Sequence, residues 1–121
     1  MSYLGISGKD LTPVIKELNQ LLCDYHVYYQ NLRNFHWNIK GSNFFELHVK
    51  FEELYDEAKL NIDAVAERIL TLRSVPLSNL TDYLKASQIK EAGKVSKDID
   101  MVNMVIENQS NEFFQQEKMY Q

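Results

Sequence analysis

The sequence predicts an all-α protein, a bundle of long helices with one short helix in a long connection. Breakers of regular structure are few, with 4 Gly and 2 Pro among 121 residues. Apolar residues recur at three- and four-residue steps over two long stretches, which is the period of an amphipathic helix. Only a few residues separate these stretches, so the two helices should form an antiparallel hairpin. The length predicts a single domain over residues 1–121.

The first stretch is predicted to be a helix that starts near Asp10 or Thr12, either of which can cap it. Pro13 is tolerated in a first helical turn. Gly41 is a natural stop just past the end. The apolar positions are Leu11, Val14, Ile15, Leu18, Leu21, Leu22, Tyr25, Tyr28, Tyr29, Leu32 and Phe35.

The second helix is predicted to open with a capping box formed by Asn43 and Glu46. It should end near Arg73, ahead of Pro76, because the residue before a proline avoids helical geometry. Its apolar face comprises Phe44, Leu47, Phe51, Leu54, Tyr55, Ala58, Ile62, Val65, Ala66, Ile69 and Leu72.

Residues 74–94 form a connection in which Thr81–Ala86 can make a short helix. A third helix should start near Ser96. Its apolar pattern falters at a run of six polar residues, 107–112. Either one helix is interrupted there or two segments meet, and periodicity does not decide between these alternatives.

Composition excludes several classes of function. The formal net charge is −4 and the pI is about 5.3, so the overall field does not attract nucleic acid. No stretch reaches the length of a membrane span, and no signal peptide is recognisable at the start. Cys23 is the only cysteine. We interpret it as a small buried side chain and expect a cytoplasmic protein without disulfides.

Six metal-binding side chains stand out near the predicted hairpin. One lies near the end of the first helix, and the other five fall in a stripe roughly 100° wide on the second helix. Imidazoles and carboxylates together suit iron, zinc or manganese. The carboxylate stripe can equally be a solvated face. The six residues are His36, His48, Glu52, Asp56, Asp63 and Glu67.

The spacing of these residues points to a site shared between two chains. His48 and Asp63 are separated by roughly 22 Å along one helix, so they cannot bind the same ion within one chain. An antiparallel second copy, related by a two-fold axis near Asp56, brings His48 and Glu52 opposite Asp63 and Glu67 of its partner, and His36 can join His48 of its own chain. An intrachain di-iron centre is not expected, because no histidine follows a glutamate in a Glu-x-x-His pair.

The sequence around these residues closely resembles the central signature of the Dps family, the mini-ferritins named as DNA-binding proteins from starved cells. The resemblance covers roughly residues 3–106 and includes the short-helix segment PLSNLTDYLKAS. The matching features are His36-Trp37, Gly41, Leu47-His48, Phe51, Tyr55, Asp63 and Ala66-Glu67-Arg68-Ile69.

The resemblance implies a ferritin-like four-helix bundle subunit, commonly assembled into a hollow shell of twelve subunits. It implies a ferroxidase that oxidises Fe(II), preferentially with hydrogen peroxide, stores iron as ferric mineral and protects against oxidative damage. One subunit would supply ligands at His36, His48 and Glu52, and the other at Asp63 and Glu67. Zinc can substitute for iron in such a ligand set. Trp37 matches a tryptophan beside the site, with core or interface packing as the alternative.

The chain departs from the family pattern in two respects. The last helix is expected to be curtailed or missing, and we suspect that residues are absent near Gln109–Asn111. Basic tails are lacking, so DNA binding is not expected. We interpret Lys85, Lys90, Lys94 and Lys97 as solvated surface charges. Two alternative functions stay open: a non-catalytic helical interaction module, and a metal-binding scaffold without turnover.

Overall fold

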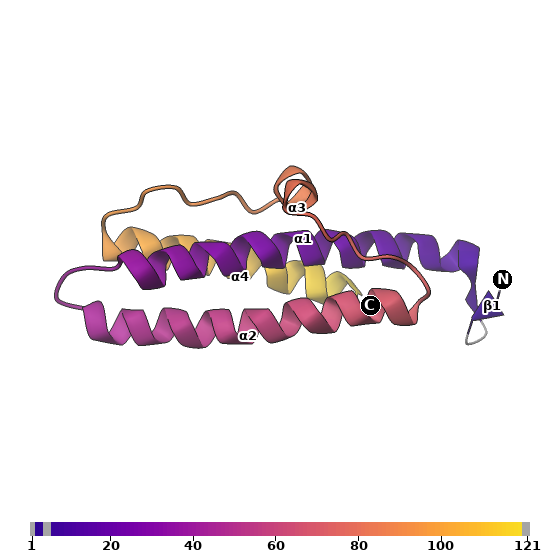
Figure 1. Ribbon diagram of the computed structural model, residues 1–121, viewed down its shortest axis with the longest axis horizontal. Helices are drawn as coiled ribbons and strands as arrows, with labels where there is room; N and C mark the ends of the chain where they lie inside the picture. Colours follow the sequence, from indigo (N-terminus) through magenta and orange to yellow (C-terminus); the bar gives the residue numbers. More distant parts are fainter. Residues whose placement is uncertain (1, 4–5, 120–121) are drawn as a thin grey trace.

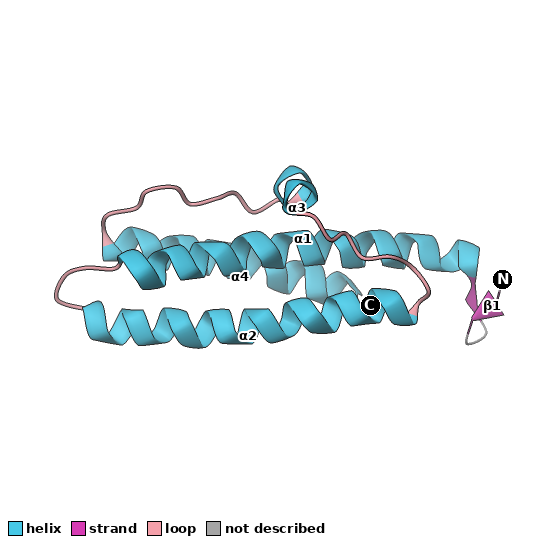
Figure 2. Cartoon of the chain, in the orientation of Figure 1, coloured by secondary structure: helices cyan, strands magenta, loops and turns pink. Residues whose placement is uncertain are grey.

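The computed structural model describes residues 2–3 and 6–119, and the side chains of residues 11–111. Over these ranges the chain is an all-α bundle, which confirms the predicted fold class (Figures 1 and 2). A minimal antiparallel hairpin, in which Ser2 pairs with Ser7, precedes the helices. The elements are β1 (Ser2–Tyr3), β2 (Ile6–Ser7), α1 (Gly8–Asn38), α2 (Phe44–Thr71), α3 (Leu80–Ala86) and α4 (Asp98–Met119).

Helix α1 is the centre of the bundle, because α2, α3 and α4 all pack against it. α2 runs antiparallel to α1, and the connection after α2 returns along the whole bundle past α3 before α4 begins (Figure 1). The most deeply buried side chains come from α1, α2 and α4 and are mainly apolar. They include Leu22, Leu32, Phe35, Phe51, Ile69 and Met101.

The predicted helix boundaries are close to those observed, and Asn43 is the N-cap residue of α2, but neither predicted side-chain cap is formed. α1 begins at Gly8, so Asp10 and Thr12 lie inside it. Asn43 does flank α2, yet its side chain makes no capping bond. Instead, its amide Nδ2 donates a hydrogen bond of 3.0 Å to the carboxylate of Asp98 at the start of α4. A tertiary partner therefore replaces the local capping box.

Helix α4 passes through the polar run without interruption, so neither of the two alternatives left open by the sequence is correct. Residues 109–111 lie inside this helix. Gln109 Nε2 donates a hydrogen bond of 3.0 Å to the hydroxyl of Tyr28 on α1. A polar position thus contributes to the α1–α4 contact, which an apolar stripe alone cannot reveal.

Polar side chains of α1 hold the connection between α2 and α4 in place. The fully buried carboxylate of Asp24 accepts hydrogen bonds from the backbone N–H of Gln88 (2.8 Å) and from the hydroxyl of Ser87 (3.2 Å). Asn31 accepts a bond of 2.9 Å from the N–H of Ala92. Loss of solvation raises the pKa of Asp24 above its usual range, although its donors oppose this.

Cys23 is fully buried and free, as predicted for a small core side chain. Burial raises the pKa of its thiol to about 11, and the nearby carboxylates of Asp24 and Asp82 add to the shift. None of the described helices is both long and apolar enough to cross a membrane.

Candidate metal centre

The hairpin between α1 and α2 brings His36, in the last turn of α1, against His48, in the second turn of α2. Gly41 makes this tight connection possible, because its φ of +106° lies in a region that residues with a Cβ rarely adopt. The N–H of Phe44 then bonds to the carbonyl of Gly41 at 3.2 Å. The two histidines are 12 residues apart in the sequence and in direct contact in space.

Each histidine is held by the backbone of the other. His36 Nδ1 lies 2.7 Å from the carbonyl oxygen of His48, and His48 Nδ1 lies 2.8 Å from the carbonyl oxygen of His36. A carbonyl oxygen can only accept a hydrogen bond, so each Nδ1 carries the proton. In the neutral rings the lone pair is then on Nε2. This is how metal-binding histidines are usually oriented and held in one tautomer.

Aromatic packing restricts both rings further. The imidazoles are stacked with their centroids 3.7 Å apart and an interplanar angle of 16°. Phe44 stacks on His48 at 4.9 Å, and Tyr55 meets His36 edge-on at 5.3 Å. His36 itself is buried. Both imidazole rings are therefore held in fixed orientations.

Of the side chains that the structure describes, Glu52 is the acidic residue within ion-pair distance of these histidines. Its Oε1 lies 3.8 Å from His36 Nε2, and half of its side chain is exposed. His36 thus contacts both His48 and Glu52, the two other ligands predicted from the same chain, beside the turn of the hairpin.

Asp63 and Glu67, the other two predicted ligands, lie exposed further along α2 and do not approach this group. Among the described side chains, no three His, Cys, Asp or Glu residues are arranged to enclose a metal ion. The five predicted ligands of one chain therefore lie at two separate places, three beside the hairpin turn and two further along α2. Asp56, between them, is also exposed.

Large apolar side chains lie on the same face of α2 as the acidic residues, and the sequence pattern did not predict them there. Phe45, Val49 and Leu60 are 80%, 52% and 71% exposed. At 100° per residue they fall within roughly 40° of Asp56, together with Asp63. Three exposed apolar side chains argue against a plain solvated face, because such groupings mark contact surfaces. Only the exposure of these side chains reveals the contact surface. Periodicity alone does not distinguish a second apolar face from a stripe of carboxylates.

Trp37 is not a core residue, whereas packing at an interface or a place beside the site stays a prediction. Its side chain is 58% exposed and lies under the guanidinium of Arg33, at 4.7 Å from the ring centroid. Arg33 also lies 5.2 Å from the ring of Tyr29, which meets Tyr55 edge-on. Desolvation raises the pKa of Tyr55, with smaller contributions from the carboxylates of Glu52 and Asp56.

His26 is a packing residue. Its ring stacks on Tyr83 of α3 with centroids 3.8 Å apart, and burial lowers its pKa. Tyr25 and Tyr28 are buried in the core, as predicted, while Tyr29 is only partly buried.

Residues 15–113 match the model of the ferritin-like domain. Two curated relatives are each 48% identical to this chain. One is an uncharacterized protein of Haemophilus influenzae, matched over 94 residues, which are 78% of this chain and 59% of that protein. The other is the DNA protection during starvation protein of Porphyromonas gingivalis, matched over 91 residues, 75% of this chain and 57% of the relative. The chain thus spans somewhat more than half the length of these relatives.

Solved structures of Dps proteins are also similar to this chain. The Dps protein of Vibrio cholerae, described as a member of a superfamily of ferritin-like diiron-carboxylate proteins, superposes with a TM-score of 0.93 at 40% identity. The match covers 98% of this chain and 75% of that one. Dps from Staphylococcus aureus gives a TM-score of 0.84 at 46% identity, over 88% of this chain and 71% of its own.

Proposed function

Because the chain belongs to the Dps proteins of the ferritin-like family, we propose that it is a ferroxidase and iron-storage protein of the cytoplasm. It oxidises Fe(II) with hydrogen peroxide at sites shared between two subunits, and this reaction protects the cell from oxidative damage. The ligands of each site are His36, His48 and Glu52 of one subunit with Asp63 and Glu67 of its partner.

The reciprocal hydrogen bonds between His36 and His48 are the observation that carries this proposal. They leave one Nε2 lone pair on each ring, and the Nε2 of His36 lies 3.8 Å from the carboxylate of Glu52. Imidazole nitrogens suit ferrous iron, and carboxylate oxygens stabilise the ferric product. A pair of histidines serving only to fill a core would not need both rings held in one tautomer with the same nitrogen free.

A second subunit completes the ligand set in the proposal. The exposed apolar residues Phe45, Val49 and Leu60 favour an isologous contact between two α2 helices, because burying them stabilises the pair. With the axis near Asp56, Asp63 and Glu67 of one chain approach His48 of the other. The dimer then contains two equivalent sites. Storage requires a closed assembly, which we propose to be the twelve-subunit shell implied by the family.

Iron is the substrate of the reaction, and the electrons balance without another reductant. Two Fe(II) ions each lose one electron, the O–O bond of one peroxide accepts both, and two protons complete two water molecules. A two-electron reduction releases no hydroxyl radical. The chain's own residues bind and orient the ions, and zinc competes for the same nitrogen and oxygen ligands.

The test is anaerobic Fe(II) oxidation on adding hydrogen peroxide, recorded for the unaltered protein and for His36→Ala and Asp63→Ala. Glu57→Ala is the matched control, since Glu57 is an exposed acid on α2 outside the acidic face. We expect both site variants to fall to the rate of free iron and the control to keep the full rate. The mass in solution, measured on the same samples, reports the assembly.

Two other outcomes would select the alternatives. Oxidation no faster than free iron in all four proteins, with no binding of Fe(II) or Zn(II), would leave a helical interaction module. Metal binding that depends on His36 and Asp63 but gives no oxidation would leave a metal-binding scaffold.

A further inference from the structure

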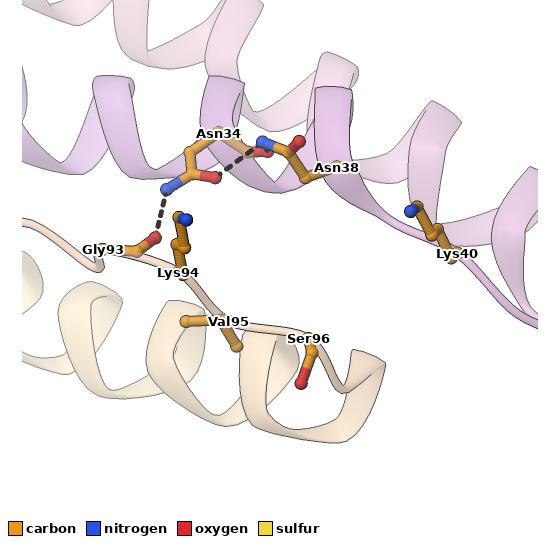
Figure 3. A pocket seen from close by; sticks show the side chains of 7 residues that line it. All are labelled: Asn34, Asn38, Lys40, Gly93, Lys94, Val95 and Ser96. Atoms are coloured by element: carbon orange, nitrogen blue, oxygen red, sulfur yellow. Dashed lines mark hydrogen bonds between the residues drawn. The ribbon is translucent and has the colours of Figure 1, made fainter.

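A cavity of about 480 Å³ lies away from the metal centre, between the C-terminal end of α1 and the segment that leads into α4 (Figure 3). Residues more than 50 positions apart in the sequence form its walls. We call it the Lys40–Lys94 pocket. Its lining residues are Asn34, Asn38, Lys40, Gly93, Lys94, Val95 and Ser96.

The lining of the pocket is cationic, although the protein as a whole carries a net charge of −4. It contains two lysines and no carboxylate. Neither Lys40 nor Lys94 forms an ion pair with any of the side chains described between residues 11 and 111. Both lysines are exposed, and an anion bound in the pocket would be attracted by each ammonium group.

Hydrogen bonds fix the walls of the pocket. Asn34 Nδ2 donates to the carbonyl of Gly93 at 2.9 Å, which ties the incoming segment to α1. Asn38 Nδ2 donates to both the carbonyl and the side-chain oxygen of Asn34, at 2.8 and 2.9 Å. Gly93 has a φ of +67°, a conformation in which glycine is favoured. Lys94 extends from this segment toward Asn34 (Figure 3).

We propose that the Lys40–Lys94 pocket binds a small phosphate-type oxyanion, either free phosphate or the terminal phosphate of a small ester. Two ammonium groups match the charge of a phosphate dianion, and lysine binds phosphate as a compact point charge. This role is independent of the proposed ferroxidase. In it Lys94 binds phosphate, whereas the sequence alone was interpreted as giving Lys94 only a solvated surface charge.

The test uses the full chain without iron, because ferric ions would themselves bind phosphate. Calorimetric titration with inorganic phosphate at low ionic strength is compared between the unaltered protein and Lys40→Gln/Lys94→Gln. The control is Lys16→Gln/Lys85→Gln, which removes the same charge from exposed positions outside the pocket. Helical content and thermal midpoint confirm that each variant folds.

We expect saturable binding of phosphate that weakens at least about tenfold in the pocket variant and is unchanged in the control. Equal weakening in both variants would show a general charge effect and overturn the proposal, as would the absence of saturable binding. A short DNA duplex is titrated in parallel. Pocket-dependent binding of the duplex without binding of inorganic phosphate would also overturn it, since the partner would then be a nucleic acid.

Discussion

The imidazole rings of His36 and His48 lie face to face with centroids 3.7 Å apart, and each Nδ1 bonds to the backbone carbonyl of the other residue. Two residues on different helices thereby determine each other's orientation. The same contact joins the two helices of the α1–α2 hairpin, so pairing of the helices also fixes both imidazole rings. The orientation of the rings should therefore survive only while both helices stay paired.

Mixing two inactive variants distinguishes a shared site from a site within one chain. If His36→Ala and Asp63→Ala chains are unfolded together and refolded, half of the dimers should be mixed. Each mixed dimer then holds one intact site and one doubly altered site. We expect the Fe(II) oxidation rate to recover to roughly a quarter of the unaltered rate.

Mixing His36→Ala with His48→Ala serves as the control, because both residues belong to the same half-site and no intact site can form. Recovery in this control, or none in the first mixture despite proven exchange of subunits, would contradict a site divided as proposed.

Phe44 should matter for metal binding although it has no ligand atom. Its ring stacks on His48 at 4.9 Å, with an interplanar angle of 17°. We expect Phe44→Ala to weaken Zn(II) or Co(II) binding about tenfold, the lower end of the effect of residues that orient metal ligands. Phe44→Tyr keeps the ring and should bind almost normally. Titration with Co(II), followed by its absorption spectrum, measures the affinity of both variants and of the unaltered protein. Equal affinity in all three would show that Phe44 does not orient His48 for metal binding.

Asp24 should be important for stability rather than for activity. Asp24→Ala leaves the N–H of Gln88 without its buried acceptor and removes one of the two acceptors of the Ser87 hydroxyl. We expect the free energy of unfolding to fall by roughly 3 kcal/mol. Glu57→Ala should change it by less than about 0.5 kcal/mol, because Glu57 is exposed. Urea unfolding measures both variants, and a near-neutral Asp24→Ala would show that the connection is held by other contacts.

The pH dependence of this effect has a definite sign. Burial raises the pKa of Asp24 in the folded chain, so the folded state binds its proton more tightly than the unfolded state. The stabilisation from this proton is fully present below the unfolded pKa and is lost as the pH rises through the folded value. The stability difference between the unaltered protein and Asp24→Asn should therefore shift in favour of the unaltered protein between pH 7 and about pH 4. Unfolding curves at both values test this shift, and a constant difference would contradict it.

Cys23 should be unreactive in the native protein. It is fully buried, and its thiol has a pKa raised to about 11, so thiolate is scarce at neutral pH. We expect no reaction with an aromatic disulfide reagent until urea is added, and then one thiol per chain. Cys23→Ala gives the blank for both conditions. Rapid labelling of the native protein would mean that the packing between α1 and α3 opens readily.

Much of the candidate site could be predicted from residue types and spacing. The positions of His36, His48 and Glu52 follow from two helices joined by a short turn, and their proximity within one chain is confirmed. The participation of Asp63 and Glu67 stays a prediction, because it depends on a second chain. The exposed Phe45 and Leu60 were not recognised as a contact surface, since exposure follows only from how α2 rotates against α1.

The sequence by itself determined the helices, the short α3 and the residue types available to bind metal, because helical periodicity and turn residues act over a few positions. Only the tertiary structure decided which nitrogen of each histidine is free, that Asn43 reaches Asp98 instead of capping α2, and that Asp24 binds the connection 64 residues away. It also brought Lys40 and Lys94 to one pocket. These outcomes depend on hydrogen bonds and packing between distant segments, whose partners local patterns do not specify.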